Sequence, residues 1–230
     1  MRKPEVDYRN LRLSNLTSPQ YRHLLLLLGW VGYFILFFLT ENFIPAESCT
    51  PVHCPLDDII PFCEWFVIPY VGWYVLIVWS LLYFALYNVE HFKGLQKYII
   101  VTQIVAMTCY IIVPTRQDLR PETFANENIL TWIMGLIYSI DTNTGVCPSL
   151  HVAYSIGIAS TWLKEKKSSV WTRTFVVVFV ILVCLSVVFT KQHSAVDIFA
   201  AIPVCILAEY LVYIRPKQSK KKKERETFNG

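Results

Sequence analysis

Residues 66–89 read FVIPYVGWYVLIVWSLLYFALYNV and contain no Asp, Glu, Lys or Arg. A helix needs about 20 mostly apolar residues to cross the hydrocarbon core of a bilayer. The Trp and Tyr residues of this stretch suit the two membrane interfaces, where amphipathic rings accumulate. The stretch therefore predicts a transmembrane helix, and it sets the class of the whole chain.

The rest of the chain shares this apolar character. Of its 230 residues, 54% are hydrophobic and 17% are charged, whereas a soluble domain carries about 25% charged residues. The apolar residues come in long runs instead of alternating, which favours helices over strands. Five further spans are predicted at 23–40, 98–114, 148–163, 174–190 and 194–214. We therefore predict an all-α, polytopic membrane protein with six transmembrane helices.

One more apolar run, residues 129–140, is too short to cross a bilayer. We predict an interfacial or re-entrant helix there, before the fourth span. The chain then divides into a polar segment at 1–22, one six-helix membrane domain at 23–214 and a lysine-rich tail at 215–230. For the tail we predict disorder, because it has too little apolar surface to bury.

The charge distribution predicts the orientation of these helices. Six spans place both termini on one side of the membrane, together with the turns at 88–97 and 164–173. That side holds eighteen of the twenty-one Lys and Arg residues, and such an excess marks the cytoplasmic side. We expect an integral protein of a bacterial plasma membrane with cytoplasmic termini. The extracytoplasmic side holds only three cations, Arg116, Arg120 and Lys191.

The remaining polar features indicate no soluble partner. The first apolar run follows a polar segment of more than twenty residues, which argues against a cleaved signal peptide. No internal repeat or nucleic-acid-binding motif is present, and the basic tail is better explained as a topology signal and an anchor to anionic lipid. We therefore expect the lipid bilayer as a partner, and no nucleic acid.

Four cysteines, Cys49, Cys54, Cys63 and Cys147, fall on the extracytoplasmic side. Oxidising conditions there permit disulfides within the 41–65 loop. The spacing fixes no pairing and makes no zinc site, because His53 beside Cys54 lacks a companion pair at ligand spacing.

His193 and Asp197 lie four residues apart at the extracytoplasmic start of the sixth predicted span. Residues at this spacing share a helix face, and an ionisable residue in a span is by default a functional-site hypothesis. A carboxylate bonded to one ring nitrogen fixes the tautomer and leaves the other nitrogen as a directed base or nucleophile. The alternative is an interfacial histidine beside an aspartate that a neighbouring helix satisfies.

Residues 147–151, Cys-Pro-Ser-Leu-His, begin the fourth predicted span on the same side. Pro148 suits the first turn of a helix. Ser149 and the free N–H groups of a helix start would form an anion cradle, and His151 could protonate a leaving oxygen. Taken alone, the motif is better explained as a helix cap followed by an incidental histidine.

Arg120, which precedes Pro121, and Arg116, one helical turn earlier, add positive charge on this side. Arginine stays ionised and matches phosphate oxygens in a bidentate way, although loop cations also contact lipid headgroups. Cations, an anion cradle, a histidine acid and a histidine–aspartate pair on one membrane face together suit phosphoryl transfer.

The order of these motifs resembles the type 2 phosphatidic acid phosphatase superfamily, which shares its core with vanadium haloperoxidases. The family pattern is K-x6-R-P, then P-S-G-H, then S-R-x5-H-x3-D. The corresponding segments here start at Val113, Pro148 and Ser186 and read V-x6-R-P, P-S-L-H and S-V-x5-H-x3-D. The resemblance covers residues 113–197 and the six-span layout.

The resemblance implies a membrane lipid phosphatase that works through a phosphohistidine, without a metal or other cofactor. It implies His193 as the nucleophile, Asp197 as its orienting partner and His151 as the general acid. The implied phosphate binders are Arg120, Ser149 and the backbone of Leu150. Expected substrates are phosphatidic acid, other lipid phosphates and polyprenyl diphosphates, cleaved at the extracytoplasmic face.

Three positions depart from the family pattern. Val113 replaces its lysine, Leu150 its glycine and Val187 its arginine, so two phosphate-binding cations are missing from their usual places. Arg116 lies three residues after Val113, and Lys191 lies four residues after Val187. We predict that Arg116 and Lys191 stand in for the missing cations and bind substrate phosphate.

Two alternative functions stay open at this point. The variant motifs also resemble the inositol phosphorylceramide synthase-like subgroup, in which an alcohol can replace water as the acceptor, so the enzyme would be a headgroup transferase. The second alternative is a non-catalytic transporter or scaffold on the same fold. The three departures favour it, whereas the intact histidines and aspartate argue against it.

Overall fold

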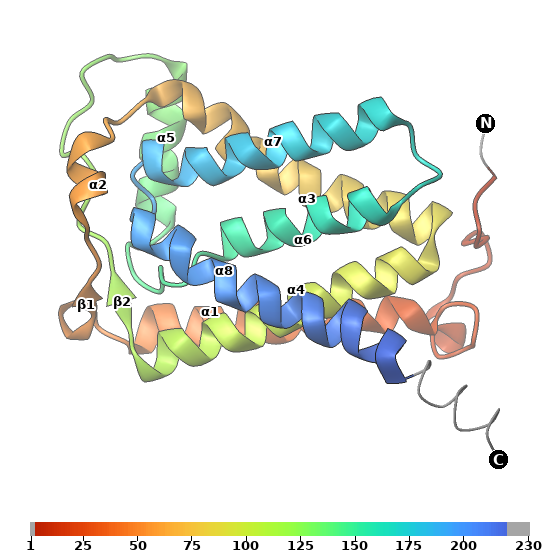
Figure 1. Ribbon diagram of the computed structural model, residues 1–230. Helices are drawn as coiled ribbons and strands as arrows, with labels where there is room; N and C mark the ends of the chain where they lie inside the picture. Colours follow the sequence, from red (N-terminus) through yellow and green to blue (C-terminus); the bar gives the residue numbers. More distant parts are fainter. Residues whose placement is uncertain (1–2, 220–230) are drawn as a thin grey trace.

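The computed structural model describes residues 3–219 of the chain (Figure 1). Within them, eight α-helices and one parallel pair of two-residue strands form, so the predicted all-α architecture is confirmed. The lengthwise helices are α1 (Leu28–Phe43), α3 (Val67–Tyr87), α4 (Val89–Ile112), α6 (Leu150–Lys164), α7 (Val170–Phe189) and α8 (Ala195–Glu209). The elements at one end are β1 (Thr50–Pro51), β2 (Thr115–Arg116), α2 (Pro55–Ile59) and α5 (Ile129–Ile140).

Short turns of other helix types flank these elements. The 3₁₀ segments are Leu13–Asn15, Arg22–Leu27, Ala46–Ser48 and Glu64–Phe66, and a π-helical segment spans Tyr210–Ile214. With these extensions, five helices are long and apolar enough to cross a bilayer: Arg22–Phe43, Glu64–Tyr87, Val89–Ile112, Val170–Phe189 and Ala195–Ser219. Their outward faces expose large apolar side chains, as expected where lipid is the solvent. The structure therefore indicates an integral membrane protein.

Helix α6 lies at the centre of the bundle and packs against α3, α4, α7 and α8. Trp162 of α6 is fully buried, and its Nε1 donates a hydrogen bond to Ser80 Oγ of α3 at 3.0 Å. Gly157 lets α4 approach closely, because a Cβ atom there would lie 2.5 Å from the ring of Tyr98. These contacts fix α6, which carries His151 in its first turn, against its neighbours.

Two predicted helix boundaries are wrong at the end of the bundle away from His151: the start of α4 and the end of the last helix. Asn88 caps α4, with its Oδ1 accepting a hydrogen bond from the backbone N–H of His91 at 3.1 Å. Most of the predicted 88–97 turn is therefore helix. The last helix continues to Ser219, so residues 215–219 of the predicted disordered tail are helical, and basic residues suit a helix C-terminus. The rest of the tail, residues 220–230, lies outside the described residues.

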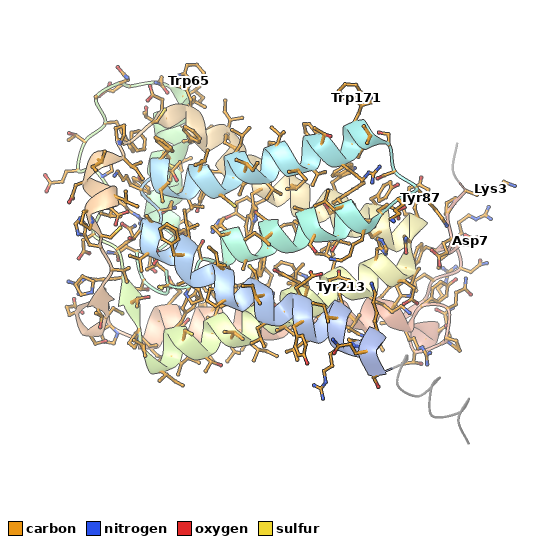
Figure 2. All side chains as sticks on the ribbon, in the orientation of Figure 1. Lys3, Asp7, Trp65, Tyr87, Trp171 and Tyr213 are labelled. Carbon is orange, nitrogen blue, oxygen red and sulfur yellow. The ribbon has the colours of Figure 1, made fainter. Side chains whose placement is uncertain are left out.

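Exposed tryptophans mark both ends of the bundle. Trp65 lies just before α3, at the end that carries α2 and α5, and Trp171 lies in the first turn of α7 at the other end (Figure 2). Indole rings favour the two membrane interfaces. Helix α5 has the bounds predicted from sequence, runs across the other helices (Figure 1), and exposes Ile129, Trp132, Leu136 and Ile140.

Candidate active site

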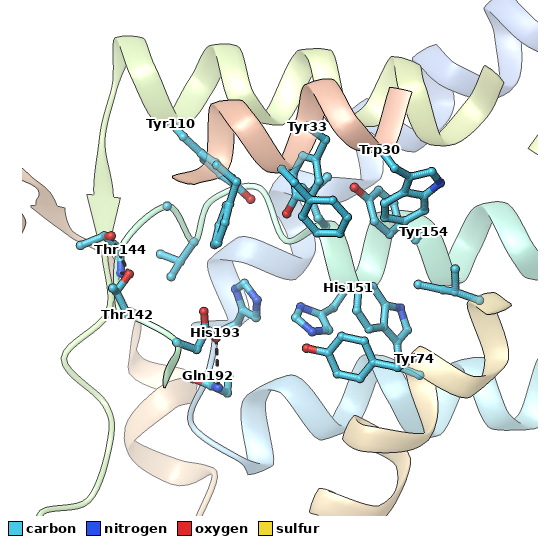
Figure 3. Close-up of a pocket in the computed structure, with 18 of the residues that line it drawn as sticks. Trp30, Tyr33, Tyr74, Tyr110, Thr142, Thr144, His151, Tyr154, Gln192 and His193 are labelled. Atoms are coloured by element: carbon cyan, nitrogen blue, oxygen red, sulfur yellow. Dashed lines mark hydrogen bonds between the residues drawn. The ribbon is translucent and has the colours of Figure 1, made fainter. Parts of the chain in front are cut away.

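The structure brings the two histidine motifs together. His151 lies in the first turn of α6, and His193 lies in the turn that leads into α8. The backbone N–H of Ser149 donates a hydrogen bond to the carbonyl oxygen of Asp197 at 3.1 Å, which joins the two segments directly. The ring centroids of His151 and His193 are 5.6 Å apart, with an interplanar angle of 66° (Figure 3). One phosphate-sized group can therefore contact both rings.

Asp197 orients the His193 ring. Its Oδ2 lies 3.0 Å from His193 Nδ1 and also accepts a hydrogen bond from the backbone N–H of Ser194 at 3.1 Å. The second contact follows from helix capping, because Ser194 is the N-cap of α8 and Asp197 is its third residue. Asp197 is fully buried. The arrangement places the proton on Nδ1, so Nε2 of His193 carries the free lone pair.

His151 is held by aromatic contacts instead of a carboxylate. Its ring stacks on Tyr70 and lies over Trp73, with centroid distances of 4.9 and 4.1 Å, both from α3. Tyr74 meets its edge at 6.4 Å (Figure 3). Among the described residues, Nε2 of His151 finds no hydrogen-bond partner although it is buried. A buried nitrogen without a partner is costly, so this atom is poised to bond to a ligand.

Both histidines face a cavity of about 470 Å³, a size typical of small-molecule sites. Its polar end is lined by His151, His193, Gln192, Asp141, Thr142 and Thr144. The rest is mainly aromatic and aliphatic, from α1 and α3 together with Tyr110, Leu150 and Tyr154 (Figure 3). The cavity therefore combines a small polar reaction zone with a long apolar wall.

The apolar wall of the cavity reaches the outside of the bundle at α1 and α3. Phe34 of α1 and Tyr74 and Val78 of α3 all line it, and each is more than half exposed. These side chains lie on helices that are long and apolar enough to span a bilayer. An apolar chain can therefore enter the cavity from the hydrocarbon region without crossing water.

Arg120 lies behind the polar end and holds its backbone in place. Its Nη1 and Nη2 donate hydrogen bonds to the carbonyl oxygens of Asp141 and Thr142 at 2.8 and 2.7 Å, and Nη2 donates to Gln192 Oε1 at 2.7 Å. Its Nε is buried and has no partner among the described residues. Arg120 does not itself line the cavity, but Gln192, its immediate partner, does.

The predicted anion-cradle residues lie at the start of α6, whereas Pro148, predicted in the first turn, precedes the N-cap. Ser149 is the N-cap of α6, and its Oγ accepts a hydrogen bond from the backbone N–H of Val152 at 3.5 Å. Leu150 and His151 are the first two helical residues, whose N–H groups lack partners within the helix. The Leu150 side chain lines the cavity. This helix start offers backbone donors beside the two histidine rings.

The other two predicted phosphate binders face elsewhere. Nη1 of Arg116 donates to the carbonyl oxygens of Ala46 and Cys49 at 2.8 and 3.1 Å, and its Nε pairs with Asp118. Lys191 Nζ donates to the carbonyl oxygens of Asp57 and Ile60. Neither side chain lines the cavity. Their role as phosphate binders stays a prediction, and the structure does not bring them to the histidines.

Val113 and Val187 occupy the positions at which the family pattern has cations. Val113 follows the end of α4 and is exposed, whereas Val187 is fully buried in α7. Neither side chain lines the cavity, and neither valine can carry a charge. The cavity therefore receives no cation from these two positions.

Sequence reasoning missed two carboxylates near the site. Asp141 lines the cavity, and its Oδ2 accepts a hydrogen bond from Gln192 Nε2 at 3.4 Å. Asp57, from α2, is buried against the N-terminus of α8. No spacing signal could reveal Asp57, because its partner Ser194 lies 137 residues away.

The cysteines form no disulfide, and all seven are free. Burial and the neighbouring Asp197 carboxylate raise the pKa of Cys147 to about 12, so this thiol stays protonated beside the histidine–aspartate pair. Within residues 3–219, no group of three His, Cys, Asp or Glu residues is arranged to hold a metal ion.

Comparisons with protein-family models, curated proteins and solved structures find no match to this chain. The resemblance to the type 2 phosphatidic acid phosphatases therefore stays a prediction from three short motifs. Any function has to be argued from the site itself.

Proposed function

We propose that this protein is an integral membrane lipid phosphatase similar to the type 2 phosphatidic acid phosphatases. The observation that carries the proposal is the pair of histidine rings, 5.6 Å apart at the polar end of one cavity. One ring is oriented by a buried carboxylate, and the other has a buried nitrogen that finds no partner in residues 3–219. A nucleophile with its own orienting group and a separate acid are the parts that covalent phosphoryl transfer requires.

The proposed reaction has two steps. In the first, Nε2 of His193 attacks phosphorus, the phosphorus–oxygen bond to the lipid breaks, and His151 protonates the departing oxygen. The positive charge that forms on the His193 ring is stabilised by Asp197. In the second step, His151 takes a proton from water, which attacks the phosphohistidine and releases inorganic phosphate. Neither step requires a metal ion or a further co-reactant.

Phosphate binding is assigned to donors around the polar end. The free backbone N–H groups of Leu150 and His151 lie at the start of α6, and both residues line the cavity. Arg120 places its fixed positive charge behind Gln192. Ser149 shapes the helix start as its N-cap. Arg116 and Lys191 are assigned no phosphate contact, because their side chains bind loop carbonyls outside the cavity.

The apolar wall of the cavity supports a lipid as the substrate. Phe34 and Val78 of this wall are exposed on helices that are long and apolar enough to span a bilayer, and the histidines lie at the polar end. A lipid phosphate can place its tail against Phe34 and Val78 while its headgroup reaches His193. A free sugar phosphate or nucleotide has no apolar chain to place against this wall, so it would make no use of the larger part of the cavity.

The proposed topology has six membrane-crossing helices, with α6 as the sixth. At 15 residues α6 is shorter than the five candidate spans, which have 20 to 25 residues. It nevertheless runs beside them through the bundle, and both described chain ends lie at one end (Figure 1). That end carries most of the Lys and Arg residues and is assigned to the cytoplasm. The histidines then lie at the extracytoplasmic face.

A headgroup transferase is the second candidate. The observation that favours it is the carboxylate of Asp141, which lines the polar end with the hydroxyls of Thr142 and Thr144. These acceptors suit an amine or a polyol better than they suit a second phosphate. In this case an alcohol takes the place of water in the second step.

Product analysis separates the candidates. The purified protein is reconstituted in nanodiscs with a lipid phosphate carrying a labelled phosphorus atom, with and without a lipid alcohol. Release of labelled inorganic phosphate supports the phosphatase, and appearance of a new labelled lipid supports the transferase. His53→Ala is the matched control, because His53 lies in an exposed loop at the same end. If His193→Ala turned over substrate like His53→Ala, neither proposal would survive.

A further inference from the structure

Asp57 is a buried carboxylate that the proposed reaction does not use. It lies in α2, in the loop between α1 and α3, and does not line the cavity. Its Oδ2 accepts hydrogen bonds from Ser194 Oγ at 2.5 Å and from the backbone N–H of Cys54 at 2.8 Å. Its Oδ1 accepts from the backbone N–H of Ala195 at 2.8 Å. Asp57 therefore satisfies donors in the first turn of α8 from outside that helix.

These bonds continue to the His193 ring. Ser194, held by Asp57 through its hydroxyl, donates its backbone N–H to Asp197 Oδ2 at 3.1 Å. The same oxygen lies 3.0 Å from His193 Nδ1. The order of contacts is thus Asp57, Ser194, Asp197, His193. The N-terminal dipole of α8 stabilises both carboxylates at this helix start.

The loop around Asp57 contacts the histidine turn at further points. Lys191 Nζ donates to the carbonyl oxygen of Asp57 at 2.8 Å. The backbone N–H of Cys63 donates to the carbonyl oxygen of Phe189 at 3.0 Å, and the ring of Phe66 stacks on that of Phe189 at 4.3 Å. Lys191 itself has a positive φ of 54°, a left-handed conformation that is unfavourable for a non-glycine residue. The loop supplies contacts that hold this turn.

The ionisation of Asp57 agrees with this geometry. Burial alone would raise the pKa of the carboxyl group, but hydrogen bonds from Ser194 and from the backbone of Ala195 and Cys54 lower it below its usual value. Asp57 is therefore a carboxylate at neutral pH. An ionised acceptor makes stronger hydrogen bonds than a neutral one.

We infer that Asp57 is a positioning residue for phosphoryl transfer: through Ser194 and Asp197 it holds the His193 ring in the orientation that attacks phosphorus. The inference rests on the proposed function for its effect on rate. The effect of Asp57 on the orientation and protonation of the His193 ring does not depend on any substrate. The effect on rate and the effect on the ring are therefore tested by separate measurements.

The rate is tested with Asp57→Asn, which keeps the shape but replaces one acceptor oxygen by a donor. Asp58→Asn is the matched control, because Asp58 is the next residue, is exposed and pairs with His53 instead of with α8. We expect Asp57→Asn to lower kcat for lipid phosphate by at least tenfold with KM changed less than twofold. Asp57→Glu is expected to recover part of kcat, and Asp58→Asn to behave like the unmodified protein.

The orientation is tested without substrate by nitrogen NMR of protein labelled at its histidines, with His193→Ala assigning the signal. We expect a protected Nδ1–H signal from His193 that broadens or disappears in Asp57→Asn and persists in Asp58→Asn. If Asp57→Asn does not fold, Ser194→Ala removes the same link from the other side, with a smaller loss of at least threefold in kcat expected.

The outcomes are distinct. A variant that loses thermal stability but keeps kcat per folded molecule and the His193 signal would overturn the inference and leave Asp57 as a helix cap. Loss of the His193 signal in a protein that releases no phosphate from any lipid would contradict the proposed function while supporting the positioning role. An unchanged signal together with unchanged kcat would also overturn the inference.

Discussion

Asp141 is the carboxylate at the polar end of the cavity, and in the proposed function its charge acts on the substrate headgroup. It lines the cavity beside Gln192 and His193. Burial raises the pKa of its carboxyl group, while the positive charge of Arg120 acts in the opposite direction. A carboxylate here repels a phosphate dianion and attracts an ammonium group.

Asp141→Asn tests whether Asp141 repels the substrate phosphate or attracts a cationic headgroup. For a lipid phosphate without a cationic headgroup, we expect KM to fall about fivefold, since one nearby like charge contributes ~1 kcal/mol. Steady-state kinetics in nanodiscs measure this, with the exposed Asp118→Asn as the control from the same end of the bundle. A rise in KM would instead indicate that Asp141 binds the headgroup, as the transferase proposal requires.

Substitutions of Lys191 and Arg116 test the prediction that these two residues replace the cations that the family pattern has at positions 113 and 187. Both side chains bind backbone carbonyls of the 46–60 loop. We therefore expect Lys191→Ala and Arg116→Ala to lower the free energy of unfolding by about 1 kcal/mol for each hydrogen bond lost, with KM unchanged. Thermal unfolding and kinetics of the same samples separate the two effects. A severalfold rise in KM at full stability would support phosphate binding as predicted from sequence.

At the scale of elements, the contact between α2 and α8 is sensitive to acid. A carboxyl group with a lowered pKa in the folded state stabilises the fold above its unfolded pKa, and this contribution is lost as the pH falls through the folded pKa. For Asp57, whose ordinary pKa is 3.8, the contribution is complete at neutral pH and disappears below that value.

The difference in stability between Asp57→Asn and the unmodified protein should depend on pH in the same way. At pH 7 we expect it to unfold more easily than the unmodified protein by about 2 kcal/mol, the range for hydrogen bonds to a charged group. Near pH 3 the difference should shrink, because protonated Asp57 resembles asparagine. Thermal melts of both proteins across this range measure it. A difference that stays constant with pH would show that ionised Asp57 does not stabilise this contact.

The elements also show how far the sequence could predict the fold. Helix α5 has the predicted bounds, because Asn128 supplies a cap and the apolar run ends at Asp141. The start of α4 was missed, because Glu90, His91 and Lys93 make its first turns polar although Asn88 caps them into helix. Polar residues of this kind are compatible with a helix that emerges from the membrane.

The site was predictable to the extent that it is encoded by local spacing and by topology. The four-residue spacing does bring His193 and Asp197 together, although His193 lies in the turn before α8 and not on a helix face as predicted. An even number of spans brings His151 to the same end. Contacts between distant segments were not predictable. The hydrogen bonds between Asp57 and Ser194 and between Arg120 and Gln192 depend on how the loops pack. Neither residue type nor spacing reveals this packing.

At the scale of the whole molecule, the proposed orientation makes a prediction for accessible loops. A protease site placed between Glu122 and Thr123 should be cleaved from the extracytoplasmic side of intact cells. One placed between Lys166 and Lys167 should be cleaved only after lysis, because the α6–α7 turn lies at the end with most of the positive charge. Both insertions fall at exposed residues. The reverse pattern would place the histidines in the cytoplasm.

In the proposed reaction, His193 carries the phosphoryl group during turnover. Brief incubation with lipid phosphate labelled at phosphorus, followed by denaturation in base, preserves a phosphohistidine, whereas acid removes it. We expect base-stable, acid-labile label on the unmodified protein and on His53→Ala, and none on His193→Ala. Label of equal yield on His193→Ala, or phosphate release by that variant at the rate of His53→Ala, would contradict it.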